Sequence, residues 1–164
     1  MAEVLPLSDA ELRLLQSLAR HKVRFMIVGL SAAALQGAPV VTEAVDLWFE
    51  DLADPRLTQA LAKVGAAYVP PFGLNPPMLA GKGSEPFDVV LRMDGLRKFT
   101  DEWKRAVSVR LGRTRLKVLP LERILASKQA ANRDKDQRTI PVLVNSLRTL
   151  KARHKAPSKP KPKK

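Results

Sequence analysis

The chain is 164 residues long and 45% hydrophobic, which is enough for one domain with a buried core. It contains no cysteine, so disulfides and thiolate metal sites are excluded and a reducing cytoplasm is the expected compartment. Its apolar runs are short, and its first residues lack the basic and apolar regions of a signal peptide, so we expect neither a membrane span nor secretion.

Charge is distributed unevenly along the chain. Residues 1–90 carry 7 Lys/Arg against 10 Asp/Glu, whereas residues 91–164 carry 22 against 6, and the whole chain has a net charge of +13. This asymmetry favours a polyanionic partner, because cations placed on a phosphate backbone release its condensed counterions. Either the basic C-terminal half contacts RNA or DNA, or its charges only keep the protein soluble.

The first half of the sequence predicts alternating helices and strands. Ser8 and Glu11 form a capping box in front of the first helix, and Asp54 followed by Pro55 starts a later one. Between them, Ser31 opens a short helix. The predicted helices span 9–21, 32–36 and 55–65, and the predicted strands span 23–28 and 45–50.

The second half begins with five prolines and three glycines between positions 70 and 86, which predict a long exposed loop. After it we expect strands at 87–91, 107–111 and 115–119, the last two forming a hairpin, and helices at 96–105, 121–131 and 136–150. The Lys/Pro mixture at 153–164 predicts a disordered basic tail. One domain is expected over 1–152, with an α+β fold in which helices cover a small mixed sheet and C-terminal helices complete the domain.

A phosphate site is predicted where the first strand ends. Gly29 stops that strand, and Ser31 begins a helix almost at once. The first N–H groups of a helix have no partner within the helix and carry partial positive charge, which suits a phosphate. The turn at Gly29 and Ser31 therefore fits a bound phosphate group.

Two acidic residues, Asp46 and Asp88, lie inside otherwise apolar predicted strands. A carboxylate in such a run is costly unless it is exposed, paired or bound to a metal. If both acids point to the same side of neighbouring strands, they form a hard oxygen site for Mg²⁺; otherwise they face solvent on a half-exposed sheet. Trp48 shares the face of Asp46, where it either stacks on a base or packs against the sheet.

The order of these features resembles a known family. The segments 28–31 (Val-Gly-Leu-Ser) and 42–48 (Thr-Glu-Ala-Val-Asp-Leu-Trp) are similar to the glycine turn and the Thr-x-Asp-x-Asp-Leu motif of minimal nucleotidyltransferases of the DNA polymerase β superfamily. Members of that family occur in abortive-infection and toxin–antitoxin systems. The segment 87–90 is similar to the family's strand with a third acid, and Lys128 with the run 133–136 resembles its late Lys and Arg-x-Lys-Asp signature. The resemblance covers residues 20–150.

The resemblance implies a polymerase β-like nucleotidyltransferase fold that binds an NTP and Mg²⁺. It implies transfer of NMP to an acceptor, which would be RNA such as tRNA, or else protein. Asp46 and Asp88 would be catalytic metal ligands, with Asp88 also activating the acceptor hydroxyl. A toxin–antitoxin relationship would add an antitoxin-like protein partner.

The resemblance also implies a set of nucleotide-binding residues: Gly29, Ser31, Lys128, Arg133 and Asp136. Gly29 and Ser31 would cradle the triphosphate, and Lys128 would act as a catalytic residue that contacts a phosphate. Asp136 would position Lys128 or a neighbouring cation. The alternative for the last three residues is a solvated helix face with local charge pairing.

Three positions depart from the family's pattern. Ala44 stands where the first Asp of the motif belongs, Leu30 where a second Gly or Ser belongs, and Val40 where an Arg is common. The missing acid would bridge two metal ions, and loss of a comparable group costs on the order of 10²–10⁴ in rate. Two hypotheses follow. One is an enzyme impaired by Ala44, whether that residue is native or engineered; the other is a catalytically inactive module that binds nucleic acid or a partner protein.

Overall fold

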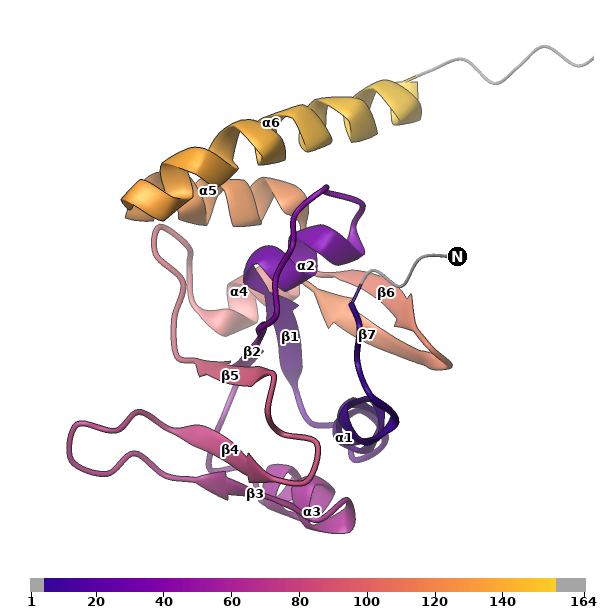
Figure 1. Cartoon of the computed structure of the whole chain (residues 1–164), viewed down its shortest axis with the longest axis vertical. Coiled ribbons are helices and arrows are strands. Elements are labelled where there is room, and N and C mark those ends of the chain that lie inside the picture. Colours follow the sequence, from indigo (N-terminus) through magenta and orange to yellow (C-terminus); the bar gives the residue numbers. More distant parts are fainter. Residues whose placement is uncertain (1–4, 156–164) are drawn as a thin grey trace, which may run out of the picture.

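A computed structural model describes residues 5–155, which form a mixed sheet with helices packed on both faces (Figure 1). The helices in this range are α1 (Asp9–Arg20), α2 (Gly29–Leu35), α3 (Pro55–Lys63), α4 (Phe99–Trp103), α5 (Leu121–Ala131) and α6 (Asp134–Lys155). The strands are β1 (Phe25–Val28), β2 (Val45–Phe49), β3 (Ala66–Val69), β4 (Met78–Gly81), β5 (Phe87–Val90), β6 (Val107–Leu111) and β7 (Thr114–Val118).

The main sheet has five strands in the order β5-β2-β1-β7-β6. Strand β1 is antiparallel to β2 and parallel to β7, while β2 is parallel to β5. Strands β6 and β7 form the predicted antiparallel hairpin at one edge. The strand that ends in the glycine turn and the strand that carries Asp46 are therefore neighbours in the middle of the sheet.

Alternation along β2 separates the two faces of the sheet. Val45, Leu47 and Phe49 are buried on one face, and Asp46 and Trp48 point to the other. The Trp48 side chain is only 3% exposed, and it meets the ring of Phe99 edge-on, with ring centroids 5.6 Å apart. Of the two roles considered for Trp48, packing against the sheet is the one observed.

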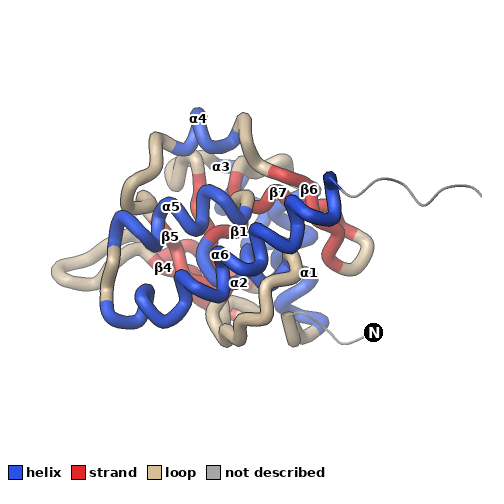
Figure 2. Tube along the Cα trace, turned by 90° about the horizontal axis from the view of Figure 1, so that it is seen from above, coloured by secondary structure: helices blue, strands red, loops and turns tan. Residues whose placement is uncertain are grey.

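Helices α5 and α6 run side by side and lie over α2, as the two perpendicular views agree (Figures 1 and 2). Asn132, with a left-handed φ of 46°, ends α5, so the chain reverses and α6 begins at Asp134. Ile124 and Leu143 are fully buried on the inner sides of the two helices. This corner holds the late Lys and Arg-x-Lys-Asp signature above one end of the sheet.

The predicted helix starts at 9 and 55 are confirmed by their caps. Ser8 and Glu11 form a reciprocal capping box in front of α1, with both hydrogen bonds at 3.2 Å. The Asp54 carboxylate accepts a hydrogen bond from the Arg56 backbone N–H at the start of α3. In both places the side chain satisfies a backbone donor that the helix leaves free.

The prediction of one long loop over 70–86 is wrong in part. Strands β3 and β4 pair antiparallel, and two backbone hydrogen bonds between Phe72 and Asn75 close the tip of this hairpin. The prolines at 70, 71, 76 and 77 lie between the paired residues rather than within them, so they remove no hydrogen bond from the ladder. The prolines therefore indicate an irregular segment only at the tip of the β3–β4 hairpin.

Helix α6 spans Asp134–Lys155 and is longer than the predicted 136–150, and two other helices begin at residues different from those predicted. Helix α2 begins at Gly29 instead of after Ser31, because the positive φ of Gly29, 68°, turns the chain into the helix as soon as β1 ends. Helix α4 begins at Phe99 instead of near residue 96. The Glu102 carboxylate reaches back and accepts the Arg97 backbone N–H at 3.0 Å, which fixes the start of that helix.

These elements form an α+β fold in which helices cover a small mixed sheet, as the sequence predicted. Helix α6 continues through residues 153–155, and residues 156–164, the rest of the predicted tail, lie outside the described residues. Across residues 5–155, each helix is too short or too polar to cross a membrane.

Candidate active site

Asp46 and Asp88 lie directly opposite each other on the neighbouring parallel strands β2 and β5. Residues at matched register positions point their side chains to the same face of a sheet. Asp46 is half-buried, whereas Asp88 is exposed. The sheet therefore brings the two carboxylates together at one edge of the domain, with Asp88 on the solvent side.

The electrostatics at Asp46 reflect this arrangement. Burial raises the pKa of Asp46, and the nearby negative charge of Asp88 raises this pKa further. The positive charges of Lys128 on α5 and Lys135 on α6 act in the opposite direction and lower the pKa. The charges of one acid and two cations, from three other elements, thus act on the Asp46 carboxylate.

The turn at Gly29 is built around the Asp46 carboxylate. Gly29 has a positive φ of 68°, and a Cβ added there would overlap Oδ2 of Asp46. Ser31, in the first turn of α2, is buried and donates its hydroxyl to the Val28 carbonyl at 2.9 Å. Its Oγ also accepts the Asp46 backbone N–H at 3.4 Å. The first turn of α2 is therefore tied to the strand that carries Asp46.

Asp136 is the centre of a buried ion-pair network at the corner between α5 and α6. Its side chain is 1% exposed and lies 3.2 Å from Lys128 Nζ and 2.8 Å from Arg133 Nε. It also accepts the Arg133 backbone N–H at 3.1 Å. Burial alone would raise the pKa of Asp136, but hydrogen bonds from Arg133 and Lys128 outweigh it and lower the pKa to about 2. Asp136 is thus ionised and holds Lys128 in place.

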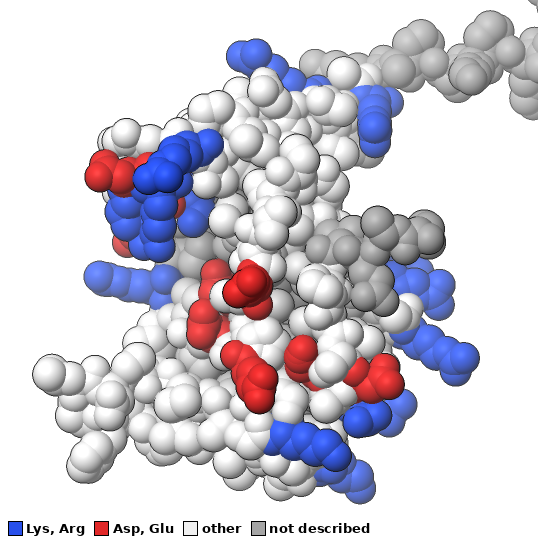
Figure 3. Space-filling model, viewed as in Figure 1, with Lys and Arg blue, Asp and Glu red and all other residues white. Residues whose placement is uncertain are grey.

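Ala44 opens onto an acidic hollow of about 380 Å³ that also contains Glu11, Glu43, Glu85 and Asp88. In Figure 3, acidic side chains gather in the middle of this face, and Lys and Arg cover the end where α5 and α6 meet. Ala44 is half-buried beside open space, so an aspartate there would have room. It would also add a negative charge to a surface that already holds four acids.

The residues present fit one Mg²⁺ ion but not two. Within the described part of the chain, no group of three or more His, Cys, Asp and Glu side chains is placed to hold a metal ion. Mg²⁺ is commonly held by one or two carboxylates together with substrate phosphates, which Asp46 and Asp88 would permit. A cation there would also relieve the repulsion that raises the pKa of Asp46. Position 44 is alanine, so it offers no carboxylate that could ligate a second ion.

The arrangement of strands and helices matches solved nucleotidyltransferase structures. The crystal structure of ANT(2″)-Ia in complex with adenylyl-2″-tobramycin aligns with a TM-score of 0.57, over 87% of this chain and 90% of that chain, at 12% identity. An antigenic nucleotidyltransferase-like protein from Paracoccidioides brasiliensis aligns with a TM-score of 0.54, over 94% of this chain and 81% of that chain, at 20% identity. The chain has a nucleotidyltransferase fold.

The fold is also that of the antibiotic-resistance factor ANT(2″)-Ia in solution, which aligns with a TM-score of 0.57 at 12% identity, over 88% of this chain and 91% of that chain. No protein-family model and no curated protein matches the sequence. At these identities the likeness concerns the fold alone. The predicted nucleotidyltransferase fold is therefore confirmed, while the toxin–antitoxin relationship and the roles of single residues stay predictions.

Within this nucleotidyltransferase fold, most predicted site residues converge. Asp46, Asp88 and Gly29 meet at one end of the sheet, and the charge of Lys128, on α5, acts on Asp46. Arg133, Asp136 and Ser31 stand behind them, bonded to neighbouring protein groups. Sequence reasoning did not single out Lys135, whose charge acts on Asp46. The Arg-x-Lys-Asp run at 133–136 contained the signal, because one helical turn of it supplies both Lys135 and the carboxylate that holds Lys128.

Proposed function

We propose that this chain binds a nucleoside triphosphate with Mg²⁺ at Asp46 and Asp88 and transfers the NMP to an acceptor, at a rate reduced by Ala44. The observation that carries the proposal is the in-register pair of carboxylates, with Lys128 and Lys135 near enough for their charges to lower the pKa of Asp46. The nucleotidyltransferase fold supports the class of reaction. Mg²⁺ bound to the two carboxylates would supply charge neutralisation to the triphosphate.

The bond changes assign a role to each side chain. An acceptor hydroxyl oxygen forms a bond to the α-phosphorus, the bond from that phosphorus to the bridging oxygen breaks, and pyrophosphate leaves. Asp88 is exposed and lies beside the space at Ala44, so it is the carboxylate placed to take the hydroxyl proton. Lys128 and Lys135 neutralise the phosphate oxygens on the opposite side.

Arg133 and Asp136 support this site by fixing Lys128. A lysine ammonium on a free four-carbon stem loses rotamer entropy when it is held against a phosphate. The pair with Asp136 places the Lys128 ammonium at one point before any ligand binds. Gly29 supplies the turn, and the backbone N–H groups that begin α2 lie next to Asp46.

For the acceptor, we propose RNA such as tRNA, with protein as the other polymer that a nucleotidyltransferase of this kind could modify. The cation excess of residues 91–164 favours the polyanion. The neighbouring structure of ANT(2″)-Ia contains an adenylylated small molecule, adenylyl-2″-tobramycin, which is a property of that protein.

A second function is favoured by Ala44 itself. With no acid at position 44, the chain would keep nucleotide or nucleic-acid binding and lose turnover, acting as an inactive module that binds RNA or an antitoxin-like partner. The two proposed functions involve the same ligands and differ only in whether the chain transfers NMP. Loss of one catalytic carboxylate corresponds to a rate deficit on the order of 10²–10⁴.

Incorporation of labelled NTPs into total RNA and protein, with Mg²⁺, tests the proposal. We expect slow labelling of RNA by the chain itself and labelling faster by on the order of 10²–10⁴ for Ala44→Asp. Ala44→Asp combined with Asp88→Asn is the matched control and should be inactive. Labelling by Ala44→Asp alone would favour the inactive module. Labelling by neither would refute transfer at this site.

A further inference from the structure

Trp103, at the end of α4, lies close to two cationic side chains and to an aromatic ring. Arg24 Cζ lies 5.6 Å and Lys117 Nζ 5.9 Å from the centroid of the Trp103 ring. The ring of Phe99 stacks with that of Trp103 at 5.5 Å and an interplanar angle of 25°. The aromatic ring thus brings two cations close to each other, one from the residue before β1 and one from β7, although like charges repel.

Two more cations line the hollow beside this ring. The hollow measures about 300 Å³, and Lys22, Arg24, Arg115 and Lys117 lie along its wall with Trp103. Among residues 5–155, no acidic side chain lines it. We call these five residues the Trp103 cluster. They come from the turn after α1, the residue before β1, the end of α4 and strand β7, so only the fold brings them together.

The hairpin β6–β7 extends the cluster along the edge of the sheet. Arg110 stands directly opposite Arg115, and Ser108 opposite Lys117, so these four side chains share one face of the ribbon. Like charges directly opposite each other destabilise an antiparallel pair. A row of backbone phosphates along this face would replace that repulsion by attraction.

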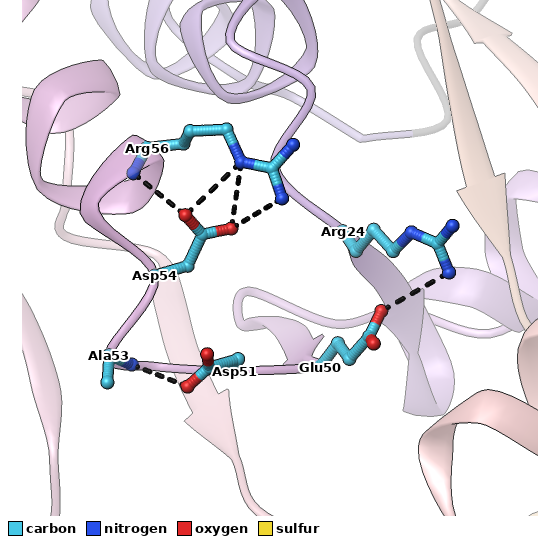
Figure 4. A network of polar contacts seen from close by, with 6 residues as sticks. All are labelled: Arg24, Glu50, Asp51, Ala53, Asp54 and Arg56. Carbon is cyan, nitrogen blue, oxygen red and sulfur yellow. Dashed lines mark hydrogen bonds and ion pairs between the residues drawn. The ribbon is translucent and has the colours of Figure 1, made fainter.

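Figure 4 shows three acids of the segment that follows β2, and two of them have partners other than Arg24. Asp54 is held by Arg56, with Nη2 2.8 Å from Oδ2, and Asp51 accepts the Ala53 backbone N–H at 2.9 Å. Glu50 contacts Arg24 at 3.4 Å, but both side chains are substantially exposed. An exposed pair of this kind is worth only about 0–1 kcal/mol, so a phosphate can compete for Arg24.

The Trp103 cluster lies at the opposite end of the central strands from the candidate active site. Along β1, Val28 is paired with Asp46 and Phe25 with Phe49, and Arg24 precedes Phe25. Arg24 is level with Glu50, four residue steps from Asp46, which is about 13 Å at 3.3 Å per residue. A ligand that uses both sites must therefore be extended.

We propose that the Trp103 cluster and the basic face of β6–β7 bind the phosphate backbone of single-stranded RNA. Lysine and arginine side chains from separate elements match a chain of phosphates, and the absence of acid in the hollow excludes a cationic occupant. The inference rests on the proposed function in one respect only: RNA held here would present its end to Asp88. RNA binding itself needs neither nucleotide nor metal.

The test is fluorescence anisotropy of a short labelled single-stranded RNA, in EDTA and without nucleotide, over a series of salt concentrations. The test variant is Arg115→Gln with Lys117→Gln. The matched control is Arg138→Gln with Arg148→Gln, two exposed arginines of α6, which lowers the net charge equally. We expect about tenfold weaker binding for the test variant and a salt slope smaller by about 1.4, since each lost phosphate contact removes about 0.7.

The control pair should change the affinity less than threefold. Equal losses for both pairs would show that net charge alone is responsible and would overturn the proposal. Binding to anionic vesicles but not to RNA, with the same residue dependence, would also overturn it. If the test variant does not fold, Lys22→Gln with Arg24→Gln, which lies between α1 and β1, replaces it and should weaken RNA binding to the same degree. RNA binding with no NMP transfer would refute only the proposed function. NMP transfer without RNA binding at these residues would refute only the present inference.

Discussion

Gly29 lies against the carboxylate of Asp46, so close that a Cβ at position 29 would overlap Oδ2 of the aspartate. The glycine also has a φ of 68°, in the left-handed region that side chains disfavour. One residue therefore meets two requirements, the turn from β1 into α2 and the space for a half-buried acid. The same contact ties the predicted phosphate turn to the predicted metal ligand.

Gly29→Ala should destabilise the protein by about 1–3 kcal/mol from backbone strain, with a further cost from displacement of Asp46. Chemical denaturation measures the change. Gly73→Ala is the matched control, because Gly73 has a φ of 59° but no atom within 4 Å of an added Cβ. Equal losses for the two variants would contradict the close approach of Gly29 and Asp46.

Asp46→Asn should raise the melting temperature at pH 7 in EDTA. The pKa of Asp46 is raised from its ordinary 3.8 by burial and by Asp88, so the folded state keeps a proton that the unfolded state has already lost. Stability from this group is present below pH 3.8 and is lost as pH rises through the raised pKa. The gain of Asp46→Asn should thus disappear below pH 3.8, while Glu43→Gln, at an exposed acid, should change little. A gain independent of pH would contradict this explanation.

Asp136→Asn should lower the free energy of unfolding at pH 7 by about 2 kcal/mol. The pKa of Asp136 is lowered from 3.8 to about 2, and each pKa unit corresponds to about 1.36 kcal/mol. The pKa shift of Asp136 is opposite in direction to that of Asp46, so its contribution to stability changes with pH in the opposite direction. Stability from Asp136 is present above pH 3.8 and is lost as pH falls from 3.8 towards the lowered pKa of about 2. The stabilities of the variant and the parent should therefore converge in acid. Asp134→Asn, at an exposed neighbour, is the control, and a similar cost for both substitutions would argue against the buried network.

Ala44→Asp should lower the melting temperature in EDTA and regain it in Mg²⁺. The new carboxylate joins Asp88 and three glutamates around the hollow, so repulsion increases when no cation is present. Bound metal then stabilises the folded state by linkage. Ala44→Asn, which adds bulk without charge, should show no such dependence. A Mg²⁺ response shared by both variants would indicate that the ion does not bind at position 44.

The parts of the site that could be predicted were those that depend on short stretches of sequence. An acid within an apolar strand and a glycine before a helix identify Asp46, Asp88 and Gly29, because strand alternation and helix termini act over a few residues. Pairing of β2 with β5 in the register that matches Asp46 to Asp88 depends on the whole sheet. Sequence could propose that the acids meet, but only the fold places them opposite each other.

Elsewhere, long-range contacts decided what local patterns could not. Prolines at the tip of the β3–β4 hairpin concealed the paired residues on either side. The start of α4 depends on Glu102, which binds Arg123 at 2.7 Å as well as Arg97. Arg123 lies on α5, so the sequence of residues 96–105 alone does not contain this constraint. The effect of Lys135 on Asp46 and the meeting of Arg24 with Lys117 at Trp103 depend on the same kind of long-range contact.

The central claim is that Asp46 and Asp88 bind a nucleotide together with Mg²⁺. Calorimetric titration with a non-hydrolysable NTP analogue tests it most directly, because the result does not depend on turnover. The account predicts binding in Mg²⁺ that EDTA abolishes and that Asp46→Asn or Asp88→Asn weakens at least tenfold, about 1.4 kcal/mol, while Glu43→Gln leaves it unchanged. Binding that survives EDTA and both substitutions, or no binding at all, would contradict it.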